Sequence, residues 1–142
     1  MSDVHFFYQK PLKSLRNREK LKEFLQKTAV SGKRRIENLN IIFCDDAYVL
    51  GINRQYLNHN FFTDIITFDL SEKKSPINAE VYISINRVKE NAKNLKLPFN
   101  QELHRVIFHG LLHLLGHRDK TSADQKSMRQ AEERLLKKYF TS

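Results

Sequence analysis

Residues 101–115 are apolar on nearly every side of a helical wheel, and yet this stretch carries three histidines. Its apolar positions are Leu103, Val106, Ile107, Phe108, Leu111, Leu112, Leu114 and Leu115. A helix with apolar residues all round lies in a core rather than on a surface. Asn100 can cap the start of this helix, and Gly116 suits the left-handed backbone that ends many helices. The sequence therefore predicts a buried helix around which the other elements must pack.

Two of these histidines give this helix a chemical role. His109 and His113 are four residues apart, so their side chains leave the same face and can share one ion. Imidazoles in apolar surroundings are costly unless their nitrogens are satisfied, and a zinc ion satisfies one nitrogen on each ring. A pair of partly exposed core histidines is the alternative interpretation. We expect one zinc ion here and no small-molecule cofactor.

Two residues compete to be the third ligand of that ion. After the chain reverses at Gly116, Asp119 can bring its carboxylate back to the histidines. His117 follows the glycine directly and has less room to return, although histidine is a common zinc ligand. We predict His109, His113 and Asp119 as the ligands, with His117 as the competitor or as a proton carrier beside the site. Three protein ligands leave a position for water, as in catalytic zinc sites.

The residue after the first histidine argues against one class of enzyme. In a His-Glu-x-x-His metalloprotease the general base directly follows the first histidine. Gly110 occupies that position here. A metallopeptidase is therefore the least favoured of the functions considered.

The rest of the chain alternates between patterns of strands and helices. Strands are predicted at residues 4–8, 39–44, 61–70 and 80–85, with a loop at 71–78. Helices are predicted at residues 17–30, 45–57, 86–95 and from 122 onward, capped in the last three cases by Asp45, Asn86 and Ser122. Strands come early and long helices late, which favours an α+β fold. We predict a single domain over residues 1–142, with a small mixed sheet packed against helices.

Length and composition fit such a domain. The chain has 142 residues, of which 40% are hydrophobic, and no apolar run reaches the roughly 18 residues of a membrane span. The N-terminus lacks the pattern of a secretory signal. Cys44 is the only cysteine, so no intrachain disulfide can form. We expect a cytoplasmic protein with no membrane partner.

Positive charge is concentrated near the N-terminus. The formal net charge is +9 at pH 7, and residues 10–35 hold ten Lys or Arg against Glu19 and Glu23. Such a concentration attracts polyanions by releasing their counterions, which makes nucleic acid the leading partner class. A solvated basic helix face explains the charge equally well. Charge alone leaves both interpretations open.

The histidine stretch resembles the signature of the YbeY family, bacterial endoribonucleases that mature ribosomal RNA. That signature is His-Gly-x-Leu-His-Leu-x-Gly-Tyr-Asp-His, and its three histidines bind zinc. The matching positions are His109, Gly110, Leu112, His113, Leu114 and Gly116. Residues 63–68 resemble the family's Thr-Asp-Val-Leu-Ser-Phe segment, and residues 79–84 resemble its Gly-Asp-Ile strand. Asn53 and Tyr56 fit a weaker pattern before them, so the resemblance spans about residues 40–120.

The resemblance implies a function as well as a fold. It implies a zinc-dependent endoribonuclease that acts on single-stranded RNA, in maturation of the 3′ end of small-subunit rRNA and in ribosome biogenesis. The implied partners are an rRNA precursor and the small ribosomal subunit. An RNA-binding ribosome-assembly factor with a structural metal is the alternative, and a metallopeptidase is the less favoured one.

Three departures from the family pattern bear on mechanism. Asp119 stands at the third histidine of the signature, and His117 replaces its tyrosine. Leu57 stands where the family has an arginine implicated in activity. Arg105 is the best substitute, because it lies four residues before His109 on the same helical face. Further candidate cations are His59, Arg118 and Lys120. We therefore predict His117 and Arg105 as the catalytic residues beside the metal.

Overall fold

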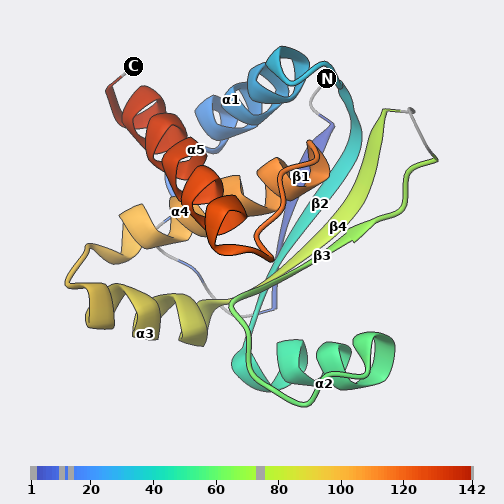
Figure 1. The fold of residues 1–142 in the computed structure, drawn as a ribbon, viewed down its shortest axis with the longest axis vertical. Helices are drawn as coiled ribbons and strands as arrows, with labels where there is room; N and C mark the ends of the chain where they lie inside the picture. The colour runs from blue at the N-terminus through green and yellow to red at the C-terminus, as the bar shows by residue number, and fades with distance from the viewer. Residues whose placement is uncertain (1–2, 10–11, 13–14, 73–75, 142) are drawn as a thin grey trace.

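A computed structural model describes residues 3–9, 12, 15–72 and 76–141 of the chain. The elements in chain order are β1 (Val4–Tyr8), α1 (Arg18–Ser31), β2 (Ile36–Cys44), α2 (Asp46–Leu57), β3 (Ile65–Asp69), β4 (Ile77–Ser84), α3 (Ile85–Leu95), α4 (Phe99–Leu114) and α5 (Ser122–Thr141) (Figure 1). The strands form one sheet in the order β1-β2-β4-β3. β1, β2 and β4 run parallel, and β3 runs antiparallel to β4. The predicted α+β class with a mixed sheet is confirmed.

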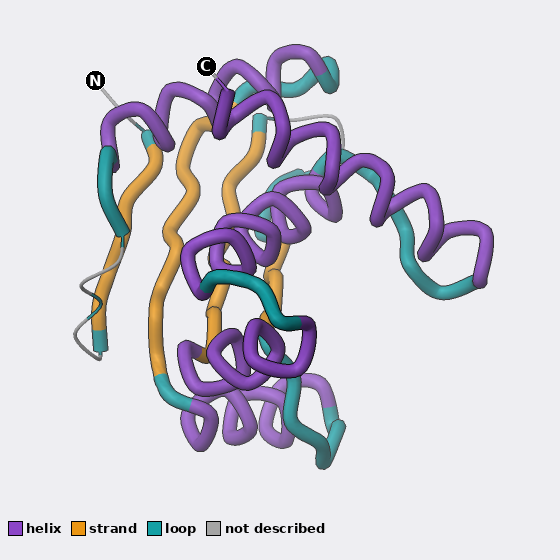
Figure 2. Tube along the Cα trace, turned by 90° about the vertical axis from the view of Figure 1, so that its left-hand side faces the viewer, coloured by secondary structure: helices purple, strands orange, loops and turns teal. Residues whose placement is uncertain are grey.

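The main core lies between one face of the sheet and the helices α1 and α4. Alternate residues of a strand face opposite sides, so β2 and β4 each contribute every second residue to this core. Core residues from these elements include Leu21, Leu25, Leu39, Ile41, Val81, Ile83, Leu103 and Ile107. Figure 2 shows the strands as one layer, with helices stacked beside it. The predicted buried helix is therefore α4, and most of its residues are buried.

A second, smaller cluster lies on the other face of the sheet. α2 contributes Val49 and Ile52, which pack with Cys44 and Ile66. Cys44 is fully buried, and burial raises the pKa of its thiol to about 12. It behaves as a small core residue, as a lone cysteine in an apolar strand suggests.

The strand predicted at residues 61–70 begins four residues late. β3 starts at Ile65, and Phe61 and Phe62 stay outside the sheet with about half of their surface exposed. The side-chain amide of Asn53 on α2 donates to the carbonyl of Phe61 at 2.9 Å. That bond ties the segment to α2 instead of to β4. Local strand propensity was overridden by a tertiary hydrogen bond.

Three predicted helix caps were wrong. Ser84, not Asn86, caps α3 by accepting from the Arg87 amide at 3.1 Å. Asn86 instead accepts from the backbone amide of Asp46, at the start of α2. Pro98 precedes α4, so Asn100 lies inside the helix, and Thr121 rather than Ser122 caps α5 through the Asp124 amide. Asp45 caps α2 as predicted, accepting from the Tyr48 amide at 2.8 Å.

In the part of the chain that the structure describes, no helix has the length and apolar character needed to cross a membrane.

Candidate metal centre and its cleft

Three side chains bring one donor atom each to a common point beside α4. His113 Nε2 lies 3.0 Å from His109 Nε2 and 3.2 Å from Asp119 Oδ2. His109 Nε2 lies 3.5 Å from that same oxygen. A tetrahedral ion with bonds of about 2.0–2.1 Å spaces its ligand atoms about 3.3 Å apart. The predicted set of His109, His113 and Asp119 thus fits an ion of zinc's size, and no other such group converges among the described residues.

The turn after α4 is what returns Asp119 to the histidines. Gly116 has a φ of 99°, and the amide of His117 donates to the carbonyl of Leu112 at 3.0 Å. This left-handed residue reverses the chain as predicted. His117 itself is exposed and does not line the cleft beside the histidines. The geometry therefore brings Asp119, and not its competitor, to the donor set, while a proton-carrying role for His117 stays a prediction.

A buried carboxylate on α5 orients the first histidine. Glu132 Oε2 lies 2.5 Å from His109 Nδ1, and the glutamate side chain is 3% exposed. Because Nδ1 donates its proton to that carboxylate, the neutral ring keeps its lone pair on Nε2, the atom that faces His113. Carboxylates commonly fix metal-binding histidines in this way. Burial disfavours the charged form of Glu132, but the His109 hydrogen bond and the nearby Arg105 hold its pKa below the ordinary value.

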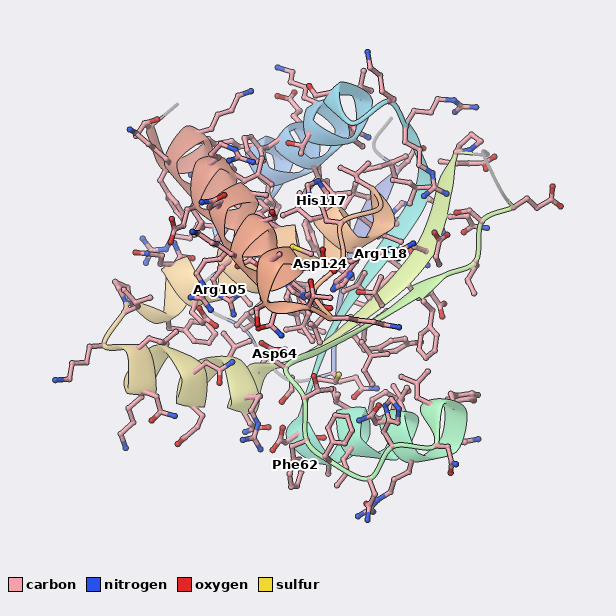
Figure 3. The ribbon with its side chains drawn as sticks, in the orientation of Figure 1. Phe62, Asp64, Arg105, His117, Arg118 and Asp124 are labelled. Atoms are coloured by element: carbon pink, nitrogen blue, oxygen red, sulfur yellow. The ribbon has the colours of Figure 1, made fainter. Side chains whose placement is uncertain are left out.

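Arg105 supports that carboxylate. Its Nη1 donates to Glu132 Oε1 at 2.9 Å, while Nε and Nη2 both donate to Glu102 at 2.7 Å. A third carboxylate, Asp64, lies 3.8 Å from Nη2, and Figure 3 shows these two side chains next to each other. The bidentate bond to Glu102 raises the pKa of Arg105 even further above neutrality. The contacts favour a positioning role, and direct contact of Arg105 with substrate stays a prediction.

Glu132 is a functional candidate that the sequence pattern did not single out. Its signal was present: it lies four residues after Met128 and three before Leu135, within the apolar stripe of α5. A glutamate on a buried stripe requires a partner. The partner's identity, however, depends on how α5 packs on α4.

The three donor atoms open into a cleft of roughly 560 Å³. Its lining comes from α4 and Asp119, from β3, and from α2 with the segment that leads from α2 to β3. Thr63 and Asp64 both line it, and burial raises the pKa of Asp64. Leu57 and His59 also line it, whereas Arg118 and Lys120 are exposed elsewhere.

Gly110 lets α4 approach the sheet closely. A Cβ atom at this position would lie 2.9 Å from Cδ1 of Ile65 and 3.5 Å from side-chain atoms of Thr67 and Val81. Close packing of α4 against β3 and β4 therefore accounts for a glycine at this position, where a metalloprotease would have its general base.

Comparison with known proteins shows the family and agrees with the fold. The family model described as Endoribonuclease YbeY matches residues 7–140. The chain belongs to the YbeY family. An Endoribonuclease YbeY from Cytophaga hutchinsonii is 44% identical over 94% of this chain and 93% of its own length. Another from Flavobacterium psychrophilum is 52% identical over 70% of each chain.

A solved structure shares the fold. The solution structure of a protein from Thermotoga maritima matches with a TM-score of 0.68 and 27% identity, covering 97% of this chain and 89% of the other. The expected YbeY membership and the expected enzyme class, a hydrolase of the nuclease type, are confirmed. His109, His113 and Asp119 form a group that could hold a metal ion in this endoribonuclease family member.

Proposed function

We propose that this YbeY protein hydrolyses a phosphodiester bond in single-stranded RNA, with one zinc ion held by His109, His113 and Asp119. The proposal rests on the convergence of three donor atoms inside a cleft, in a chain of an endoribonuclease family. A divalent ion bound there would polarise a phosphoryl oxygen and make a water molecule more acidic.

The charges of the cleft make RNA binding dependent on that ion. Asp64, Asp69 and Asp119 line the cleft, and Arg105 is the one Lys or Arg among its described lining residues. The Arg105 guanidinium is already engaged by carboxylates. A phosphate group therefore meets net repulsion unless a cation offsets it. We expect chelation to weaken RNA binding in the cleft as well as to stop cleavage.

The chain's own residues set the properties of the donors. Glu132 keeps the proton of His109 on Nδ1 and leaves Nε2 free to bind. Arg105 fixes Glu132 from the opposite side. Asp119 adds a negative charge where the family signature has a neutral imidazole, which favours a somewhat less acidic water than three histidines would.

The test is cleavage of a labelled RNA that spans the 3′ end of a small-subunit rRNA precursor. The wild-type protein with zinc should cut it, and His113→Ala should not. His5→Ala is the matched control, because His5 is exposed on β1 outside the cleft. Chelation should abolish cutting and zinc should restore it. Equal cutting by wild type and His113→Ala would refute the metal-dependent mechanism.

The rRNA substrate and the small ribosomal subunit come from the family resemblance. The basic segment at residues 10–35 supports a polyanionic partner, although parts of it have structural partners: Lys22 pairs with Glu19, and Arg34 donates to the Leu114 carbonyl at 2.6 Å. Faster cleavage of the precursor end than of an unrelated single-stranded RNA of equal length would support this substrate. Equal rates on both would leave only general single-strand cleavage.

One observation favours the second candidate, an RNA-binding assembly factor with a structural metal. Leu57 lines the cleft at the position of the family arginine, and Arg105 is committed to carboxylates. Chelation separates the two functions. A structural site predicts a large loss of thermal stability, with no RNA cleavage before or after the metal is removed.

A further inference from the structure

The segment between α2 and β3 carries an exposed pair of rings. His59 and Phe61 line the same cleft as His109 and His113. Their ring centroids are 5.1 Å apart, and their planes differ by 22°, so the two rings are stacked. Phe61 is 56% exposed and belongs to none of the hydrophobic clusters. Core packing therefore does not account for a phenylalanine at this position.

The backbone that carries these rings is held in place. Asn53 is buried, and its side-chain amide donates to the Phe61 carbonyl at 2.9 Å. The amide of His59 donates to the Asn53 carbonyl at 3.0 Å. Arg54 Nε donates to the side chain of Asn60 at 2.6 Å. The rings are thus positioned before any ligand arrives, which lowers the entropy lost on binding.

The neighbouring Phe62 differs from Phe61, because its ring already has a partner. Phe62 lies beside α2 (Figure 3), and the guanidinium of Arg87 covers its ring at 4.9 Å. Arg87 is itself paired with Asp46 at 2.7 Å. Phe62 therefore already has a partner on one ring face, and it does not line the cleft.

The chemistry of the cleft indicates what the free rings can bind. Its lining is rich in carboxylates and its one described arginine is occupied, so attraction for phosphates is confined to the metal centre. Nucleobases stack on aromatic side chains regardless of sequence, because every base has a π-face. Bases inside a duplex are already stacked on one another and are not available to such rings.

We propose that His59 and Phe61 form a stacking platform for one unpaired nucleobase, next to the phosphodiester that lies at His109, His113 and Asp119. This inference rests on the proposed function, and it names the substrate class: RNA with at least one unpaired nucleotide beside the cut. The platform gives a physical reason for acting on single strands, and it sets no preference among the four bases.

The test combines a protein change with a substrate change. Zinc-loaded protein is given a short labelled RNA, or the same RNA with one nucleotide made abasic at each position in turn. Phe61→Leu keeps an apolar side chain but removes the ring. It should raise KM on the intact RNA about tenfold, with kcat within about twofold. At one abasic position, wild type and Phe61→Leu should be equal. Phe61→Trp should behave like wild type.

Three further variants separate stacking from other effects. Phe7→Leu is the matched control, because Phe7 is 49% exposed on β1 and does not line the cleft. His59→Phe keeps an aromatic ring that cannot carry a charge, and its KM should equal that of wild type. His59→Ala removes the ring, and its KM should rise. An equal rise in KM for His59→Phe and His59→Ala would show that His59 acts through its charge, and it would overturn the platform. Equal KM for wild type and Phe61→Leu, or the same loss on every abasic RNA, would also overturn it.

Binding measurements distinguish failure of this inference from failure of the proposed function. RNA affinity is measured with zinc-loaded wild type and Phe61→Leu under conditions of no turnover. In one outcome RNA is not cut, Phe61→Leu binds intact RNA about tenfold more weakly than wild type, and the two proteins bind the abasic RNA equally. The platform then stands and the nuclease proposal fails. If RNA is cut and Phe61 has no effect on KM or affinity, the nuclease stands and the platform fails.

Discussion

His104 in the first half of α4 and His109 in its second half both face α5, but α5 offers them different partners. The His104 ring stacks on Tyr139 with centroids 5.1 Å apart, and its Nδ1 lies 2.7 Å from the Asn100 carbonyl. His109 meets Glu132 and turns its other nitrogen toward His113. One helix thus holds a histidine that packs among aromatic rings and a histidine that belongs to the candidate metal site. The neighbouring helix decides which role each one takes.

Removal of one histidine from each half of α4 should have the largest effects. His113→Ala should abolish zinc binding, and the melting temperature should no longer rise when zinc is added. His104→Ala should retain one zinc per chain but lower the free energy of unfolding by about 2–4 kcal/mol, because it leaves a cavity among aromatic rings. Zinc analysis after dialysis and chemical denaturation measure both. Loss of zinc in His104→Ala with an intact fold would contradict the division.

Glu132→Gln tests the role of the partner that α5 offers to His109. The amide keeps the size of the side chain but removes the charge that holds the His109 proton. Zinc affinity should fall roughly 10- to 100-fold. Glu133→Gln is the matched control, because Glu133 is the exposed neighbour on α5. Affinity is measured by competition with a coloured chelator. An unchanged zinc affinity in Glu132→Gln would show that His109 does not need this partner.

These two halves also show what the sequence could and could not predict. The pair His109 and His113, and the return of Asp119 after Gly116, depend on helix geometry and one turn, so local sequence was sufficient. Glu132 lies 23 residues after His109 on another helix. Its contact exists only because α5 packs on α4, and no local pattern contains that information.

The same distinction applies to the fold. Long periodic elements such as α4 were predicted well, because burial of a continuous apolar face fixes them. The caps of α3 and α5 and the start of β3 were not. Asn86 had the right chemistry for a cap, but the Asp46 amide engages its side chain. Phe61 had strand propensity, but Asn53 binds its carbonyl. In both cases a partner on another element decided between two locally acceptable structures: Asp46 of α2 for Asn86, and Asn53 of α2 for Phe61.

Gly110, next to His109 in the second half of α4, sets how closely this helix approaches the sheet. Gly110→Ala should lower the free energy of unfolding by about 1 kcal/mol, because Ile65 must move away from the new methyl group. Gly51→Ala on α2 is the matched control: nothing lies within 4 Å of the added atom, so it should raise the free energy of unfolding by about 0.5–1 kcal/mol. Urea denaturation measures both. A gain of equal size in both variants would show that the approach of α4 to β3 is loose.

The smallest effect concerns the protonation of His104. The ring is 2% exposed, and burial lowers its pKa below the ordinary value; the charge of Lys20 adds to this, and the Asn100 carbonyl opposes it. In the unfolded chain a histidine has a pKa of about 6.5, so below that pH the unfolded state takes up a proton that the folded state resists. The free energy of unfolding should therefore fall as pH drops below about 6.5, by at most about 1.4 kcal/mol per pH unit, and should gain nothing above pH 7.

His104→Phe isolates that effect, because the other titrating groups are common to both proteins. The phenyl ring keeps the contacts with Tyr139 and loses the bond to the Asn100 carbonyl, which changes stability by an amount independent of pH. The difference in free energy of unfolding, wild type minus His104→Phe, should shrink steadily from pH 7.5 to pH 5.5 in the presence of a chelator. Urea denaturation at three pH values measures it. A difference that stays constant would mean that His104 accepts its proton as readily in the aromatic cluster as in the unfolded chain, and the first half of α4 would then be more accessible to water than its packing indicates.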